Sequence, residues 1–192
     1  DKFERNIIFV DQKYFIVLDK LKSSGNNYTY NWLLHFNDSK SVNFNKNNSF
    51  TFKSEKASLY SQVLFPENIQ SKIVEGPIKL DVPIKNPGYI QIDSEKKSEE
   101  NFLVILYPYT DSPVMEDFIS EVKKINNENV IGFSSGTKEF YFRTGKKEIL
   151  TDKFSTDGNI ASLTIENNTL KNFAVHNATS FLYEGKKLFE SD

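Results

Sequence analysis

Apolar and polar residues alternate along most of the chain, as is typical of β-strands with one buried face. In YTYNWLLHF, residues 28–36, one face would carry Tyr28, Tyr30, Trp32, Leu34 and Phe36. The opposite face would carry Asn31 and His35. We therefore expect a strand whose aromatic face packs into a core, with Trp32 buried and not exposed to bind a ligand.

The first residues of the chain predict a hairpin. Apolar runs at 7–10 and 14–18 are rich in β-branched and aromatic residues, which favour strands. The polar residues 11–13 between them are short enough for a hairpin loop. The run at 101–109 is continuously apolar, which indicates a central strand buried on both faces. By contrast, Pro83 limits the alternating stretch 78–84 to the edge of a sheet.

Other short apolar stretches complete the pattern. Strands are expected at 41–44, 49–52, 57–66 and 89–93, and then at 130–133, 139–143, 159–166, 170–176, 180–184 and 186–190. The turns between the last of these contain Asn or Gly, which tolerate the positive φ that tight hairpins need. The C-terminal third is therefore predicted to be a row of hairpins.

The stretch 111–125 fits two periodicities. Met115, Val122 and Ile125 lie near helical spacing, and Ser112 with Pro113 could begin a helix. The same stretch also alternates as a strand, which its β-rich surroundings favour, with one helical turn near 113–117. Together, these patterns predict one all-β domain over residues 1–192, an antiparallel sandwich of roughly 12–16 strands with little or no helix.

Composition and charge exclude several classes of function. The formal net charge is −2 and no basic run occurs, so the sequence does not favour nucleic-acid binding. The chain has no cysteine, which excludes disulfides and thiolate metal sites. No apolar run reaches the roughly 18 residues of a membrane-spanning helix. We therefore expect neither a nucleic acid nor a membrane among its partners.

The sequence shows no spacing typical of a catalytic or metal-binding motif. The two histidines, His35 and His176, fall in separate expected strands and share no zinc-binding spacing, so no metal or other cofactor is predicted. His176 is expected at the surface. No nucleophile elbow, phosphate-binding loop or isolated pair of acids is present. For Arg5, two positions stay open: a surface side chain, or an inward-facing one paired with an acid.

Five stretches occur in a characteristic order. They are ERNIIFVDQKYFIVLDKL, YTYNWLLHF, LYSQVLFPE, ENFLVILYPY and NATSFLYEGKKLF. Their succession resembles the C-terminal β-sandwich domain of heparinase II/III-like polysaccharide lyases, which act on uronic-acid polymers such as glycosaminoglycans. The resemblance covers nearly the whole chain. Each stretch is mostly hydrophobic, so the likeness depends on their order and spacing.

The resemblance implies a longer protein. In that family an N-terminal helical toroid and histidine-rich strands, which hold the metal and the catalytic groups, precede the hairpin that begins near Arg5. Those strands have no match here, so no catalytic or metal role is transferred to this chain. The chain is expected to be a C-terminal fragment, inactive alone, whose first hairpin packs against upstream strands of a bacterial protein that is secreted, periplasmic or on the cell surface.

The resemblance also implies the partners and a candidate groove. The full-length enzyme would bind an anionic polysaccharide and cleave it by β-elimination, and the helical toroid would contact this domain. Candidate groove residues for the carbohydrate are Arg5, Asn31 and His35. Two alternatives from other classes remain, a non-catalytic carbohydrate-binding module and a structural surface module. An exposed aromatic platform would favour the first of these.

Overall fold

The computed structural model describes residues 1–76, 86–110 and 112–191. The chain divides into two compact units, Asp1–Ser112 and Pro113–Asp192. The helix α1 (Ser112–Glu121) begins at the boundary between them. We describe each unit by itself; the single sandwich domain expected over residues 1–192 stays a prediction.

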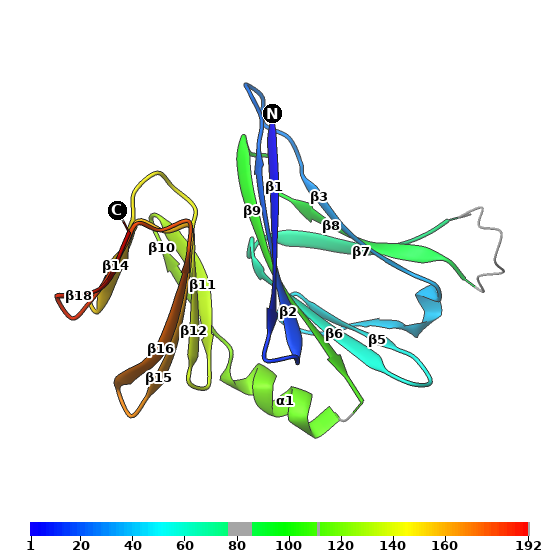
Figure 1. Cartoon of the computed structure of the whole chain (residues 1–192). Coiled ribbons are helices and arrows are strands. Elements are labelled where there is room, and N and C mark those ends of the chain that lie inside the picture. The colour runs from blue at the N-terminus through cyan, green and yellow to red at the C-terminus, as the bar shows by residue number, and fades with distance from the viewer. Residues whose placement is uncertain (77–85, 111, 192) are drawn as a thin grey trace. The chain divides into compact units, whose positions relative to one another are not determined.

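The first unit contains two antiparallel sheets (Figure 1). The larger sheet has the order β1-β2-β9-β6-β5-β4, and the smaller has the order β3-β8-β7. The strands of the larger sheet are β1 (Lys2–Val10), β2 (Tyr14–Lys22), β4 (Val42–Phe44), β5 (Ser49–Lys53), β6 (Ser58–Phe65) and β9 (Glu99–Tyr109). Those of the smaller sheet are β3 (Asn31–Phe36), β7 (Ile69–Glu75) and β8 (Gly88–Ser94), and a short 3₁₀ helix, Ser39–Ser41, follows β3.

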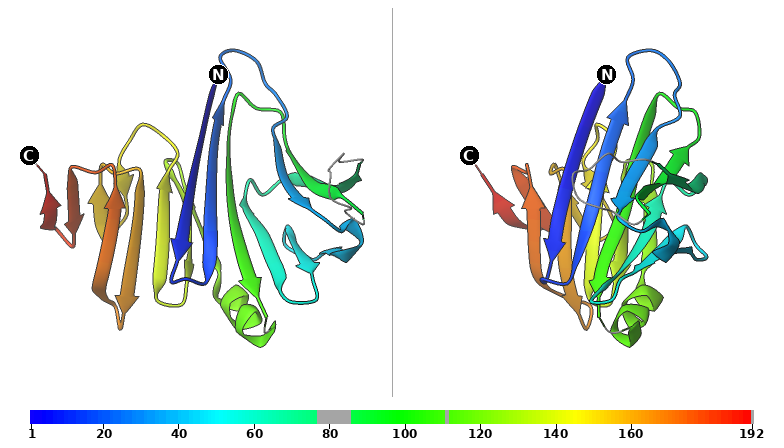
Figure 2. Two further views of the ribbon diagram at one scale, coloured as in Figure 1. Left: turned by 45° about the vertical axis from the view of Figure 1, so that its right-hand side comes forward. Right: turned by 90° about the vertical axis from the view of Figure 1, so that its right-hand side faces the viewer.

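The predicted N-terminal hairpin is confirmed. β1 and β2 pair antiparallel over their whole length, from Lys2 opposite Lys22 to Val10 opposite Tyr14. Asp11 has a φ of 49°, in the left-handed region that such turns use. β9 lies between β2 and β6, as expected for the most apolar strand, and the three lie side by side in the left view of Figure 2. β1 is an edge strand of this sheet.

The core of the first unit lies between the two sheets. Trp32 and Ile90 of the smaller sheet pack with Val17, Val63 and Val104 of the larger one. Trp32 is 5% exposed, and Tyr30, Leu34 and Phe36 pack against the same core, which confirms the inward face from residue 30 onward. Tyr28, expected on this face, is 50% exposed because it lies before the start of β3. The alternation of β3 therefore places one set of side chains in the core and leaves the other set on the outer face of the smaller sheet.

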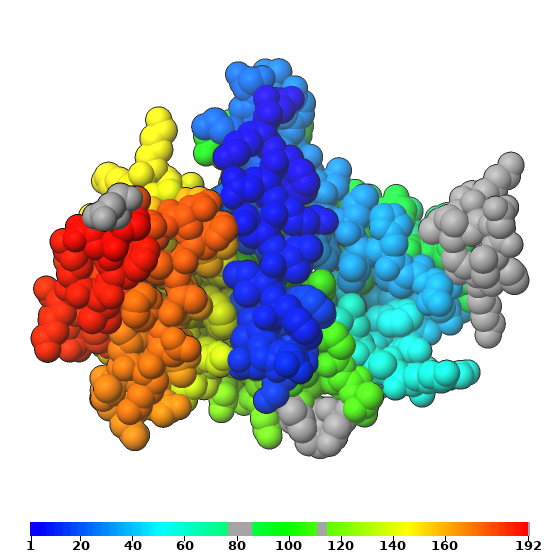
Figure 3. Space-filling model, in the orientation of Figure 1, coloured from blue at the N-terminus to red at the C-terminus, as the bar shows by residue number. Residues whose placement is uncertain are grey.

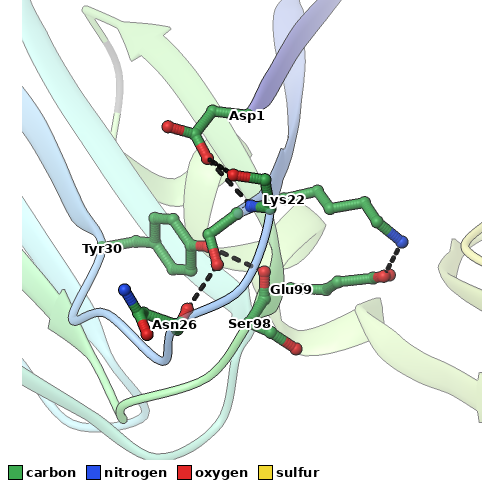
Figure 4. Close-up of polar contacts among 8 residues, drawn as sticks. Asp1, Lys22, Asn26, Tyr30, Ser98 and Glu99 are labelled. Atoms are coloured by element: carbon green, nitrogen blue, oxygen red, sulfur yellow. Dashed lines mark hydrogen bonds and ion pairs between the residues drawn. The ribbon is translucent and has the colours of Figure 1, made fainter.

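The loop before β3 is held by polar contacts (Figure 4). The carboxylate of Asp1 accepts a hydrogen bond from the backbone N–H of Ser24 at 2.9 Å. The hydroxyl of Tyr30 donates to the backbone carbonyl of Ser98 at 2.9 Å. Lys22 and Glu99 form an ion pair beside them, between β2 and β9. These contacts fix the path of the chain from the larger sheet into β3.

The second unit also has two antiparallel sheets, with orders β10-β11-β12-β15-β16 and β13-β14-β17-β18. The strands of the first are β10 (Lys123–Asn127), β11 (Val130–Ser135), β12 (Lys138–Arg143), β15 (Ile160–Glu166) and β16 (Thr169–His176). Those of the second are β13 (Ile149–Leu150), β14 (Phe154–Thr156), β17 (Ser180–Tyr183) and β18 (Lys186–Glu190). Asn167, Asn168, Asn177 and Gly185 all have positive φ at the turns, as the sequence predicted.

Three expectations need correction or fall outside the described residues. Residues 112–121 form a helix, not the strand that was favoured, and Met115 of this helix is buried. The part of the chain that the structure describes holds 18 strands, more than the 12–16 expected. Part of the excess is β7, which the sequence did not predict because its apolar positions are few. The edge strand expected at 78–84 lies outside the described residues.

Candidate functional site

The outer face of the smaller sheet collects polar side chains from three strands. Asn31 of β3 lies opposite Asp93 of β8, and Gln70 of β7 lies opposite the same aspartate from the other side. Two residues along β8 and on the same face, Gln91 lies opposite Lys72 of β7. Directly opposed residues in antiparallel strands share a face, so these side chains form one surface, which we call the polar face.

Hydrogen bonds join the polar face around Asp93. Its Oδ1 atom accepts from the side-chain amides of Asn31 and of Gln91, the latter at 2.7 Å. Its Oδ2 atom lies 3.7 Å from the ammonium of Lys72. Because both amides donate their N–H groups to Asp93, their carbonyl oxygens remain as acceptors for a ligand. The ammonium of Lys72, which is largely exposed, adds donors.

The other end of the polar face is aromatic. His35 lies opposite Tyr89 in the register, and their ring centroids are 5.2 Å apart with the planes tilted by 41°. Leu33 lies between His35 and Asn31 on the same strand and is 41% exposed. The predicted groove residues Asn31 and His35 therefore lie on one exposed face, with Leu33 between them and the Tyr89 ring beside His35.

A cleft of about 590 Å³ adjoins the Asp93 end of this face, and Asp93 and Gln70 belong to both. The charged residues of the cleft lining are Glu67, Asp93, Glu95 and Lys96, which makes three carboxylates and one ammonium. Lys72 pairs with Asp93 and Lys97 with Glu95, so the cleft has no excess of positive charge with which to bind a polyanion.

Arg5, the third predicted groove residue, lies elsewhere. It belongs to β1 of the larger sheet and donates from Nε and Nη2 to the two carboxylate oxygens of Asp19, each at 2.6 Å. Asp19 is almost fully buried, whereas the side chain of Arg5 is 45% exposed. The hydrogen bond from Arg5 to Asp19 raises the pKa of the guanidinium. Arg5 thus combines features of the two positions left open: it is paired with an acid, and its side chain remains partly at the surface.

Replacing Arg5 by alanine should destabilise the chain by about 2–3 kcal/mol, because it leaves the buried Asp19 carboxylate without its ion-pair partner. The loss is below that of a fully buried pair because Arg5 is partly solvated. Urea unfolding of the chain measures it. As a control, Lys2→Ala removes an exposed pair with Glu4 and should change the stability by less than about 0.5 kcal/mol. Equal losses in the two variants would contradict the structural role of the buried pair.

Beside Arg5, β1 exposes large apolar side chains. Phe3 is 61% exposed, Ile7 62% and Phe9 55%. Ile7 lies opposite Val17, a core residue, so the three lie on the same inner face of the sheet that β3, β8 and β7 cover further along. We call Phe3, Ile7 and Phe9 the β1 strip. β1 lies at the surface of its unit along its length (Figure 3), so this strip is a hydrophobic patch on an open sheet edge.

An apolar cavity of about 350 Å³ opens between the two sheets of the first unit. Leu34, Phe36, Phe50 and Phe52 line it, and His35 borders it. It offers almost no polar groups for a sugar, so its chemistry differs from that of the polar face.

The remaining candidates are structural. His176 is exposed at the end of β16, as expected. Asp157 accepts hydrogen bonds from Thr179 and Ser180, which lower its pKa and fix a turn. Within residues 1–76, 86–110 and 112–191, no group of three or more His, Asp or Glu side chains gathers as a metal site would require. None of the helices in these ranges is long and apolar enough to cross a membrane.

Sequence reasoning missed four residues of the polar face: Gln70, Lys72, Gln91 and Asp93. The alternation in residues 89–93 placed Gln91 on the face opposite Ile90 and Ile92, which was a usable signal. The pairing of β8 with β3 on one side and β7 on the other was not visible, because it depends on strand order.

No protein-family model matches the sequence, and no curated protein matches it. Among solved structures, the chain is similar to heparan sulfate lyase HepC from Pedobacter heparinus, at 17% identity and a TM-score of 0.45. It is likewise similar to a mutant of HepC, at 17% identity and a TM-score of 0.46. Each match covers 90% of this chain and 23% of the other, so the chain spans less than a quarter of these relatives. We draw nothing about function from a likeness at this level.

Proposed function

We propose that this chain is a non-catalytic β-sandwich domain of a heparinase II/III-like polysaccharide lyase. The succession of five sequence stretches supports this proposal. The first stretch forms the β1–β2 hairpin, and the third and fourth contain most of β6 and β9, the strands at the centre of the larger sheet. The complete protein would cleave a uronic-acid polysaccharide by β-elimination, outside the cytoplasm.

The single observation that supports this proposal best is the β1 strip. Phe3, Ile7 and Phe9 are each more than half exposed on the core face of a sheet. An exposed apolar patch on an edge strand is a surface suited to further chain, because burial removes apolar area from water and the edge offers backbone hydrogen-bonding groups. In our proposal the occupants are upstream strands of the same protein, next to its helical toroid.

The proposal assigns the chemistry to those upstream parts. β-Elimination requires a base that removes the proton α to the uronate carboxylate, and a group that neutralises this carboxylate in the transition state. We assign neither role to a residue of this chain. Its part is to support the catalytic strands through the β1 strip and to hold the hairpin in register through Arg5 and Asp19.

The test compares the complete gene product with the 192-residue chain. Both are incubated with heparan sulfate and with alginate, and the ultraviolet absorbance of unsaturated uronate products is followed. We expect the complete product to cleave one of these polymers and the 192-residue chain to cleave neither. Cleavage by the chain alone, or a complete product that cleaves no uronic-acid polymer, would overturn the proposal.

A variant pair tests the β1 strip directly. Ile7→Ser in the complete product should lower the melting temperature and activity, because it places a polar side chain in the proposed contact. The matched control is Phe44→Ser on β4, the other edge strand of the same sheet, where Phe44 is 45% exposed. If both variants behave like the unaltered protein, the strip contacts nothing and the docking role is wrong.

A further inference from the structure

We propose that the polar face and its adjoining cleft bind an uncharged, hydroxyl-rich oligosaccharide. The polar face consists of Asn31, Gln70, Lys72, Gln91 and Asp93, with Tyr89 and His35 at its other end. The site includes two residues of the expected groove, Asn31 and His35, but its proposed ligand is uncharged, unlike the anionic lyase substrate. It therefore goes beyond the function proposed above and does not depend on it.

The hydrogen-bonding groups of the face match those of sugars. Hydroxyl groups both donate and accept, so they are best bound by surfaces that offer both kinds of group. Asp93 orients the amides of Asn31 and Gln91, which leaves two carbonyl acceptors pointing away from it, and Lys72 supplies donors. Because the amides are already held by Asp93, little side-chain freedom is lost when a ligand binds.

The aromatic end supplies the apolar contact that a sugar ring needs. Tyr89 and His35 contact each other by their rings, and Leu33 is exposed beside them. Flat side chains bury the apolar C–H face of a sugar ring at a low cost in conformational freedom. From Tyr89 to Asp93 the strand extends about 13 Å, so a short oligosaccharide could contact both ends at once.

Charge decides the class of saccharide. The carboxylates of Glu67, Asp93 and Glu95 and the ammonium of Lys96 line the cleft at the Asp93 end, and Lys97 lies 3.9 Å from Glu95. On the face itself, Lys72 is paired with Asp93. With these pairs the cleft has no excess of positive charge to attract a sulfated or uronate-rich chain, whereas an uncharged chain needs none. The site is therefore assigned to an uncharged glycan.

The experiment uses ¹⁵N-labelled 192-residue chain and four hexasaccharides. Three of them, cellohexaose, mannohexaose and xylohexaose, are uncharged, and the fourth is a heparin hexasaccharide. We expect at least one uncharged hexasaccharide to shift the backbone amide signals of β3, β7 and β8, with little dependence on salt. Shifts at these strands with heparin alone, or with none of the four, would overturn the proposal.

Two variants locate the site. Tyr89→Ala and Gln91→Ala should each weaken binding about tenfold, at a melting temperature that calorimetry shows to be nearly unchanged for Gln91→Ala. Tyr28→Ala is the matched control, an exposed tyrosine that does not belong to the polar face. Equal weakening by Tyr28→Ala would overturn the assignment. The variants are compared in the 192-residue chain with an uncharged hexasaccharide, whereas the lyase test uses the complete product with charged polymers, so failure here leaves the lyase proposal untouched.

Discussion

The Trp32→Ala variant is expected to lose about 3–5 kcal/mol of unfolding free energy, the usual cost of truncating a large buried side chain. Trp32 is 5% exposed and packs between the two sheets of the first unit, against residues such as Val63 and Val104 of the larger sheet. Its removal leaves a cavity that a rigid two-sheet core refills only in part. Urea unfolding followed by far-ultraviolet circular dichroism measures the loss.

Trp32→Phe is the control for this prediction. The indole N–H has no hydrogen-bond partner among the described residues, so replacing the indole by a benzyl ring removes no hydrogen bond. We expect this variant to lose less than half as much stability as Trp32→Ala. An unchanged urea midpoint in Trp32→Ala would mean that the side chain is exposed in solution, and the packing of the two sheets would then be wrong.

The second large effect is expected in the other unit, from Gly132→Ala. Gly132 lies in β11, opposite Tyr141 of β12. A Cβ atom built on Gly132 would lie 2.0 Å from the backbone carbonyl oxygen of Phe140. This oxygen belongs to the paired strand, so it cannot move without disturbing the ladder. We expect a loss of at least about 3 kcal/mol, at the upper end of overpacking effects.

Gly25→Ala is the matched control, because nothing lies within 4 Å of a Cβ atom built there. This change should stay within about 0.5 kcal/mol of the unaltered chain, as is usual for surface substitutions. Melting temperatures of the two variants, or the soluble yield if Gly132→Ala fails to fold, distinguish them. Equal stability of the two would show that β11 and β12 are not paired in this register.

The two alanine variants also separate what the sequence indicates from what it does not. The inward position of Trp32 follows from alternation, which is a local property of residues 28–36. The crowding at Gly132 is different. It depends on the register between two strands, and no feature of VIGF indicates that a backbone oxygen of β12 lies against this residue.

The helix at 112–121 shows a second limit of prediction from sequence, which is ambiguous periodicity. Helical and strand periodicities both fit the apolar residues of this stretch, so the pattern alone could not decide between them. The strand-rich neighbourhood favoured the wrong one. In the structure, residues 112–121 form a helix, and the burial of Met115 accompanies it. The local sequence was compatible with both helix and strand, and in such cases tertiary packing selects between the two.

The sequence by itself determined the all-β class, the N-terminal hairpin, the central position of β9 and the Asn-containing turns, because alternation, apolar runs and turn propensity act over a few residues. Only the tertiary structure decided which strands are neighbours. It brought Asn31, Gln91 and Lys72 from three strands to one aspartate, and it paired Arg5 with Asp19 instead of placing it beside His35. Strand order and register depend on contacts between residues far apart in the chain, which local patterns do not encode.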